Sequence, residues 1–300
     1  MKALLIEIRR EFWEHRALWM APLAIAVVLL LAGAVFGHAW LDIHDGHGLQ
    51  DGDGLPHLYQ LVLLGWAVPF YLAAAILASA YLLDCLYAER RDRSILFWRS
   101  MPVSDARTVL VKLLVGLVIV PLGTYALAAV TSVLASAILV LRNHGLLIGH
   151  GLLINAPGVI PWSTPAWLQM QGYMLYGLSA ALLWYAPLAA YLLLISVWAR
   201  RSPYAWAFIP PVLLVIFEHL EFGTNYVGRI LDGSFGELLH LAYRFDAAGA
   251  GASVQLGRGA QQLALTPLRL LASPRLAWGL LAAALMIAAA IRLRRYRDDS

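Results

Sequence analysis

Residues 17–41 read ALWMAPLAIAVVLLLAGAVFGHAWL and contain no Asp, Glu, Lys or Arg. About 20 apolar residues in a helix, rising about 1.5 Å each, cross the roughly 30 Å hydrocarbon core of a bilayer. This stretch is long enough to do so. It therefore predicts a transmembrane helix, and with it the class of the whole fold, an all-α integral membrane protein.

Five further apolar stretches have the same character. They are Gly54–Leu83, Leu113–Leu141, about Gln171–Trp198, Ser202–Phe217 and Leu276–Ile291. The last two are shorter, and each would need snorkelling side chains at its ends or a thinner bilayer. The sequence thus predicts about six transmembrane helices in a single transmembrane domain, residues 1–300.

The overall composition agrees with this class of protein. Hydrophobic residues make up 61% of the chain and charged residues 13%, with a mean hydropathy of +0.71. A soluble domain has roughly a quarter of its residues charged, so lipid must cover much of this chain. Cys85 is the only cysteine, which excludes an intrachain disulfide and a cysteine pair for a structural metal.

The distribution of Lys and Arg predicts the orientation. With both termini in the cytoplasm, the outer segments hold only six of the 22 basic residues. These six are Arg142, Arg229, Arg244, Arg258, Arg269 and Arg275. The excess of basic residues on the inner side follows the positive-inside rule for a multi-pass protein of the plasma (inner) membrane. The net charge of +4 therefore indicates topology, and we expect no nucleic-acid partner.

Residues 1–17 precede the first apolar stretch and lack the pattern of a cleavable signal peptide. At helical spacing, Leu4, Leu5, Ile8 and Phe12 share one face, and Glu7, Arg10, Glu11 and Glu14 lie around the other. This pattern favours an amphipathic helix in the inner interface, with Trp13 and Trp19 at headgroup depth. Two roles stay open, a topological anchor or a helix that also contacts a cytoplasmic partner.

The cytoplasmic segment 84–106 connects the second and third predicted spans. It is charged from Glu89 to Arg93, then apolar from Ile95 to Trp98, and Ser104 or Asp105 can cap the helix that follows. Exposed aromatic residues flanked by arginines are typical of protein contact surfaces. The alternative is an interfacial helix with snorkelling arginines. We favour docking of a soluble partner.

The stretches REFWEHRALWMAP (10–22) and YAERRDRSILFWRSMPVSDARTVLVKL (87–113) resemble the permease subunits of the type-two, export class of ABC transporters. The resemblance extends over nearly the whole chain and includes the six spans, the long outer segment before the last span and the basic tail. The positions that match the family pattern after span two are Glu89, Arg91, Asp92, Ser94, Leu96, Ser100, Pro102, Val103 and Ser104. Lys112 matches a basic residue that often opens span three, while Arg93-Ser94 replaces the Gly-Thr of many members.

The resemblance implies that segment 84–106 forms a coupling helix seated in a groove of a separate ATP-binding subunit. The expected coupling residues are Glu89, Arg90, Arg91, Asp92, Arg93, Leu96, Phe97, Trp98, Met101 and Pro102. Phe97 and Met101 share a helical face, and Arg90→Ala alone should do little. ATP and Mg²⁺ would bind to the partner, because this chain has no phosphate-binding loop of the form G-x-x-x-x-G-K-[ST]. No cofactor and no catalytic residue are expected here, and a second permease copy would complete a homodimer or heterodimer.

Residues 38–57, the first outer loop, are rich in His and Asp. His44, His47, Asp51 and Asp53 are the candidates for a Zn²⁺ or Cu²⁺ site, although a solvated Gly- and Asp-rich turn is the interpretation that we favour. The loop supports a second hypothesis, a membrane-embedded metal-binding protein or enzyme. A sensor or receptor subunit is a third.

The segment 221–275 carries an apolar pattern that a plain loop would not need. Ile230, Phe235, Leu238, Leu239 and Ala242 fall roughly on one helical face. The pattern predicts one or two short amphipathic or re-entrant outer helices before the last span. The transported substrate is not identified by any residue of the chain.

Overall fold

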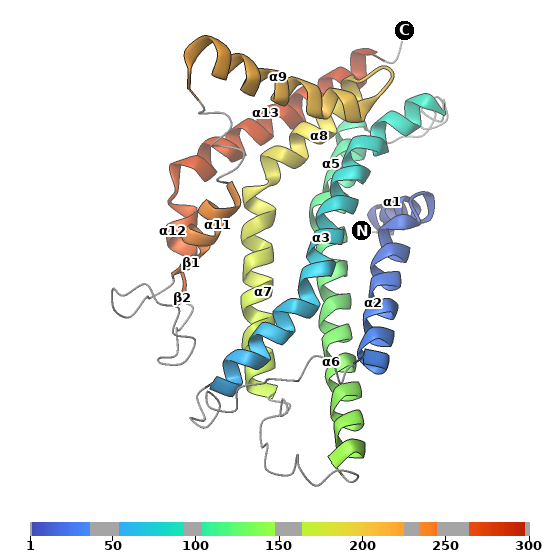
Figure 1. Ribbon diagram of the computed structural model, residues 1–300. Coiled ribbons are helices and arrows are strands. Elements are labelled where there is room, and N and C mark those ends of the chain that lie inside the picture. The colour runs from blue at the N-terminus through green and yellow to red at the C-terminus, as the bar shows by residue number, and fades with distance from the viewer. Residues whose placement is uncertain are drawn as a thin grey trace.

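The computed structural model describes residues 2–36, 54–92, 104–147, 164–224, 234–244 and 264–297 (Figure 1). In the first half of the chain its elements are α1 (Lys2–Glu14), α2 (Ala17–Phe36), α3 (Gly54–Arg91), α5 (Asp105–Leu114), the π-helical stretch η1 (Val115–Ile119) and α6 (Val120–Leu147). In the second half they are α7 (Thr164–Trp184), α8 (Ala186–Trp198), α9 (Pro203–Phe222), α11 (Ser234–Ala242), β1 (Tyr243–Arg244), β2 (Ala264–Leu265), α12 (Pro267–Leu271) and α13 (Pro274–Arg297).

The described helices confirm the predicted class, a mainly helical chain with the spans of a multi-pass membrane protein. Five of them are long and apolar enough to cross a bilayer, and a sixth is obtained when α7 and α8 count as one bent span. Large apolar side chains such as Val28, Leu31 and Ile76 are more than half exposed. Apolar surface of this extent requires lipid or another protein to cover it.

The third predicted span is one continuous rod with a π-helical turn inside it. In η1 the Val120 N–H bonds to the carbonyl of Val115, five residues back. The next residue, Pro121, has no N–H to continue a regular α-helical ladder, and a wider turn accommodates this loss. At the same level Gly116 lies against α3, where an added methyl group would come within 2.7 Å of the Leu82 side chain.

The fourth predicted span is broken, which corrects the continuous stretch Gln171–Trp198. The structure has two helices, α7 and α8, which meet at Tyr185 and bend by 50°. Pro187 lies in the first turn of α8, where its ring and its missing N–H would disrupt a continuous helix.

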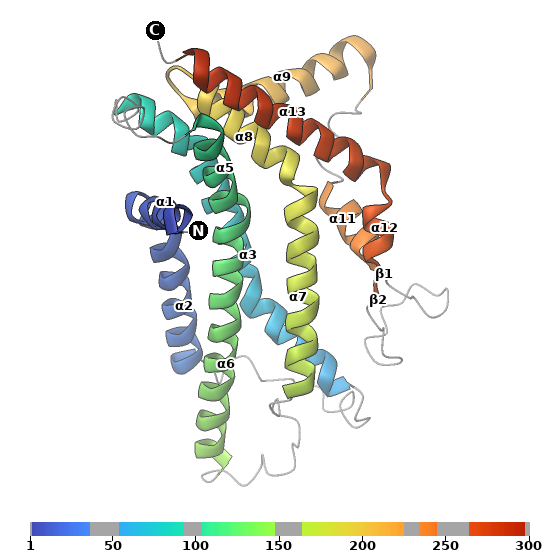
Figure 2. The ribbon, with the colours of Figure 1, turned by 180° about the vertical axis from the view of Figure 1, so that it is seen from behind.

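The long helices form a bundle that is densest at one end. Figures 1 and 2 show α2, α6 and α7 running lengthwise, while α8 and α13 lie side by side at a steep tilt. The largest buried cluster lies where α3, α5, η1, α8 and α13 meet. Its most buried members include Cys85, Val109, Val115, Leu193 and Ala290.

The fifth predicted span, Ser202–Phe217, corresponds to α9, which continues to Phe222. Ser202 caps its start by accepting a hydrogen bond from the Ala205 N–H, and Gly223 ends it with φ of 59°, a left-handed conformation that suits glycine. In both views α9 runs across the direction of α6 and α7 (Figures 1 and 2). Its flanks are largely exposed, and its buried residues are Pro203 and Ala207.

The short elements between α9 and α13 pack against α7. Leu238 and Ala242 of α11 and Leu270 of α12 bury their side chains beside Ala180 and Trp184. β1 and β2 form a two-residue antiparallel ladder beside them. The two short helices lie in the segment for which the sequence predicts one or two. The Phe235 side chain and Ile230 lie outside the described part of the chain.

Candidate functional site: a buried network of ion pairs

Lys112, on α5, is the centre of a buried ionic network. Its side chain is 1% exposed. The ammonium nitrogen lies 2.9 Å from Glu11 Oε1 and 3.2 Å from Glu89 Oε1. An isolated buried charge is very costly, so a buried lysine needs such counter-charges and hydrogen bonds.

Glu89, near the end of α3, joins this lysine to the C-terminal helix. Its second carboxylate oxygen lies 3.1 Å from Arg294 Nη2, and Arg10 Nη2 reaches the first oxygen at 3.3 Å. Arg294 also contacts Asp105 Oδ1 through Nε at 3.3 Å. Glu11, Glu89, Lys112 and Arg294 are each at most 5% exposed.

We call these six residues the charge cluster: Arg10, Glu11, Glu89, Asp105, Lys112 and Arg294. Three are cations and three are carboxylates, so their formal charges cancel. They come from α1, α3, α5 and α13, elements spread over nearly the whole sequence. The charge cluster therefore ties both ends of the chain to the helices on either side of segment 93–103.

Two aromatic side chains extend the charge cluster toward the corner between α1 and α2. The Tyr81 hydroxyl donates a hydrogen bond of 2.8 Å to Glu11 Oε2. The His15 ring meets the Tyr81 ring edge to face, with centroids 5.0 Å apart. Burial lowers the pKa of His15, against the opposing effect of Glu11, so the imidazole is neutral near pH 7.

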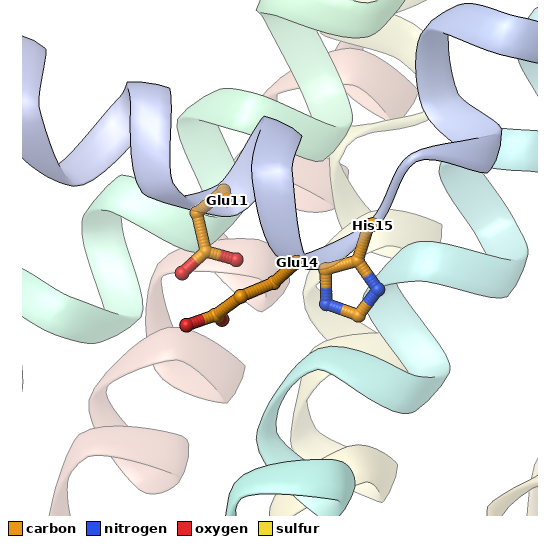
Figure 3. A group of neighbouring side chains, drawn as sticks. All are labelled: Glu11, Glu14 and His15. Carbon is orange, nitrogen blue, oxygen red and sulfur yellow. The ribbon is translucent and has the colours of Figure 1, made fainter.

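Glu11, Glu14 and His15 have the geometry of a possible metal site, with ligand atoms within 4.8 Å of one another (Figure 3). Their carboxylates already have cationic partners. Glu11 binds Lys112, and Glu14 pairs with Arg10 at 2.6 Å. Glu11 therefore belongs to the charge cluster, and Glu14 is the exposed partner of Arg10. The metal candidates predicted from the sequence, His44, His47, Asp51 and Asp53, lie outside the described residues.

Four of the predicted coupling residues are described, and their surroundings differ. Glu89 is buried in the charge cluster. Arg90 Nη2 donates to the carbonyls of Ser196 and Ala199 at 2.6 and 2.9 Å, at the C-terminal end of α8. The remaining predicted residues, Arg93, Leu96, Phe97, Trp98, Met101 and Pro102, lie outside the described part of the chain, and their contact with an ATPase stays a prediction.

The contacts of Arg90 change one expectation. From the sequence, Arg90→Ala alone should do little. Because the guanidinium satisfies two carbonyls that no longer have helical partners, its removal should instead weaken the packing of α8 on α3. Arg91 and Asp92 form a separate pair at 3.0 Å, with both side chains more than half exposed.

The helix after segment 93–103 starts as the sequence predicts. The Ser104 side chain accepts a hydrogen bond from the Arg107 N–H at 3.3 Å and so caps α5. Arg107 in turn forms an ion pair with Glu7 of α1 at 3.0 Å. Glu89 before segment 93–103, and Asp105 and Lys112 after it, thus all belong to the charge cluster.

The amphipathic helix α1 is confirmed as a helix, but its two faces divide differently from the prediction. Ile8 and Phe12 pack on the core, whereas Leu4 and Leu5, predicted on the same face, are exposed. Glu11, predicted on the polar face, is buried. The buried ammonium of Lys112 needs a counter-charge, and this requirement turns part of the polar face inward.

Sequence reasoning missed the charge cluster as a unit. The sequence presents Arg294 as one residue of the basic tail, and Lys112 as a basic residue at the start of the third predicted span. One local signal exists, because Lys112 lies inside the apolar run VLVKLLVGL (109–117). A lysine in such a run is expensive unless a carboxylate faces it. Nothing local identifies Glu11 and Glu89 as those carboxylates.

Comparison with known proteins identifies no relative. The chain matches no protein-family model, and no curated protein or solved structure gives a significant match. The resemblance to ABC permeases therefore depends on the residues quoted for it.

Proposed function

We propose that this chain is the membrane-spanning permease subunit of an ATP-driven exporter of the ABC type. A separate ATP-binding subunit would bind ATP and Mg²⁺, and a second permease copy would complete the transporter. The chain itself performs no covalent chemistry in this proposal.

The observation that carries the proposal is the position of the charge cluster. A segment that receives force from an ATPase must be joined firmly to the spans that move. Glu89 on one side of segment 93–103, and Asp105 and Lys112 on the other, belong to a single network that also holds α1 and α13. A displacement of the segment would therefore act on α1, α3, α5 and α13 together.

The proposed mechanism follows from this connection. Closure of the ATPase dimer on ATP would push on segment 93–103. The charge cluster would resist local bending, so the helices attached to it would turn as a unit and change the spans from inward-facing to outward-facing. In this proposal the charge cluster transmits movement and does not touch the substrate.

The proposed orientation places both termini and the charge cluster on the cytoplasmic side. Its support is the excess of Lys and Arg in the inner segments. The basic residues near the two termini then lie on the same side of the membrane. They are Arg9, Arg10 and Arg16 near the N-terminus, and Arg292, Arg294 and Arg295 near the end of α13.

Co-purification tests this function. The tagged chain should be expressed with the ATP-binding subunit encoded beside it, reconstituted in nanodiscs, and assayed for ATP hydrolysis with a panel of lipids, peptides and drugs. We expect a stable complex whose ATP turnover responds to at least one substrate. A matched complex with the partner's phosphate-loop lysine replaced should assemble but not hydrolyse ATP.

Two results would count against the proposal. One is the absence of any ATP-binding subunit from the purified complex. The other is a stoichiometric metal that is lost, together with activity, in the His44→Ala/His47→Ala variant, which would favour the metal-binding alternative.

A further inference from the structure

A cavity of about 160 Å³ opens where the end of α3 meets the turn between α8 and α9. In Figure 1 this turn and the end of α3 lie at the same end of the bundle. The residues that line the cavity are Tyr87, Arg90, Arg91, Ala199 and Arg200. Three of these five are arginines, so the cavity is suited to an anion. None of its lining residues belongs to the charge cluster, whose formal charges already cancel.

The three arginines differ in the hydrogen bonds and ion pairs that they already form within the protein. Arg90 is held by the carbonyls of Ser196 and Ala199. Arg91 pairs with Asp92 on the surface, where such pairs contribute little and exchange readily. Arg200 is exposed, and within the described part of the chain its side chain forms no hydrogen bond or ion pair. Arg91 and Arg200 therefore have donors available for a ligand.

The charges around the cavity leave it positive. Asp92 contacts Arg91, and Asp84 acts on Arg91 at longer range. Against these two carboxylates stand the three arginines of the lining, so one positive charge is in excess. The Tyr87 hydroxyl donates to the Arg201 carbonyl at 2.6 Å and so fixes this turn against α3.

Exposed aromatic side chains surround the same turn. Trp198 and Trp206 meet edge to face with centroids 4.5 Å apart. Both are exposed, as is Tyr204. Trp and Tyr are enriched at the depth of the lipid headgroups. Their grouping beside the arginines indicates that the cavity opens at the level of the membrane interface.

We propose that this arginine cavity binds the phosphate group of an anionic phospholipid from the cytoplasmic leaflet. Arginine suits phosphate because its planar guanidinium donates two parallel hydrogen bonds. The cavity volume of about 160 Å³ is ample, since a single water needs only about 10–15 Å³. Basic pockets between transmembrane helices on the cytoplasmic side bind anionic headgroups in this manner. The inference uses the proposed orientation and is independent of the transport function.

Native mass spectrometry of the detergent-purified chain tests the proposal. Lipid-depleted protein should be titrated with dioleoyl phosphatidylglycerol, with dioleoyl phosphatidylcholine and with inorganic phosphate in separate experiments. The test variant is Arg91→Gln/Arg200→Gln. The matched controls are Arg91→Gln/Arg201→Gln and Arg201→Gln, because Arg201 is a neighbouring exposed arginine that does not line the cavity.

The wild type should retain phosphatidylglycerol in preference to phosphatidylcholine and show no comparable binding of inorganic phosphate. Each arginine near an anionic headgroup contributes about fivefold. The Arg91→Gln/Arg200→Gln variant should thus bind phosphatidylglycerol about 25-fold more weakly, and Arg201→Gln should bind it as the wild type does. Arg91→Gln/Arg201→Gln should lose only about fivefold.

Three outcomes would overturn the proposal. Equal losses in the test variant and in Arg91→Gln/Arg201→Gln would show a general effect of surface charge. Inorganic phosphate binding as tightly as the lipid would assign the cavity to a soluble anion. Unchanged binding of phosphatidylglycerol in the test variant would show that Arg91 and Arg200 do not hold the lipid. A shared elution volume on size exclusion confirms that all variants are folded.

Discussion

Lys112 shows how a single residue determines the packing around it. Its ammonium group holds Glu11 and Glu89 within 3.2 Å, and hydrophobic side chains surround it. The charge cluster accounts for the inward turn of α1, because no other cation of the described residues contacts Glu11. We expect the stability of this end of the bundle to depend on Lys112 more than on any surface ion pair.

Replacement of Lys112 tests this dependence. Lys112→Met removes the cation that contacts the buried carboxylates of Glu11 and Glu89. Removal of one member of a buried ion pair lowers the free energy of unfolding by about 3–5 kcal/mol. Arg107→Gln is the matched control. It also breaks an ion pair between α5 and α1, but Arg107 is 41% exposed, so the loss should be below about 1 kcal/mol. Thermal unfolding of the two purified variants measures both losses of stability. Equal melting temperatures for Lys112→Met and wild type would contradict the account.

His15 gives this region a pH dependence. Burial lowers its pKa in the folded state, so the unfolded chain binds more protons at this residue below about pH 6.5. Stability is then complete above that pH and falls as the pH decreases. The charged groups that face His15 are Glu11, Glu14, Lys112 and Asp84.

His15→Phe removes the titration and keeps an aromatic ring against Tyr81. We expect the wild type to lose more thermal stability than His15→Phe between pH 7.5 and pH 5.5. Melting temperatures of both proteins at the two pH values provide the measurement. Parallel losses would show that other groups, among them the remaining histidines, cause the decrease.

At the scale of single helices, close packing at Gly177 joins α7 to the short elements before α13. A methyl group at this position would overlap the hydroxyl of Tyr243, which donates to the Tyr173 carbonyl at 2.7 Å. Gly172, on the same helix, faces open space. The two glycines therefore allow a controlled comparison of the same substitution at a crowded and at an open position of α7.

Gly177→Ala should destabilise the protein by about 1–3 kcal/mol, because overpacking forces the Tyr243 side chain to move. Gly172→Ala should be neutral or stabilising by up to about 1 kcal/mol, since alanine favours a helix. Adding Tyr243→Phe should recover part of the loss in Gly177→Ala. Thermal unfolding of the three variants distinguishes these cases, and equal effects of the two alanines would contradict the packing seen here.

The helices were more predictable than their interruptions. Long runs without charge indicate spans by composition alone, because a charge in lipid is costly. The break at Tyr185 and the π-helical turn before Pro121 depend on backbone hydrogen bonds. Pro187 and Pro121 were visible signals for them, but a proline can also be tolerated within a membrane helix, as Pro22 is in α2.

The charge cluster was the least predictable feature. Glu11 and Lys112 are far apart in the sequence, and a glutamate on an amphipathic helix has the same pattern whether it faces water or a buried lysine. The pairing is a tertiary contact, so neither periodicity nor charge spacing within one element contains it. The start of α5, by contrast, depends on Ser104 and Arg107 alone, and the sequence predicted it.

Across the molecule, the distribution of Lys and Arg predicts that both termini face the cytoplasm. Single cysteines at Ser300 and at Asp51, in a Cys85→Ala background, test this orientation in intact cells with a membrane-impermeant maleimide. The cysteine at position 51 should label from outside, and that at position 300 only after the membrane is opened. Labelling of position 300 from outside would contradict the topology and the inner-leaflet lipid site.

The proposed function requires the segment between α3 and α5 to couple this chain to an ATPase. Its most direct test is the amount of ATP-binding subunit recovered with the Phe97→Ala/Met101→Ala variant, compared with the wild type at equal membrane insertion. Truncation of buried contact residues at such a centre costs about 2–4 kcal/mol, so recovery or substrate-responsive ATP hydrolysis should fall steeply. Full recovery of the partner with normal coupling would contradict the claim and leave the segment as an interfacial connector.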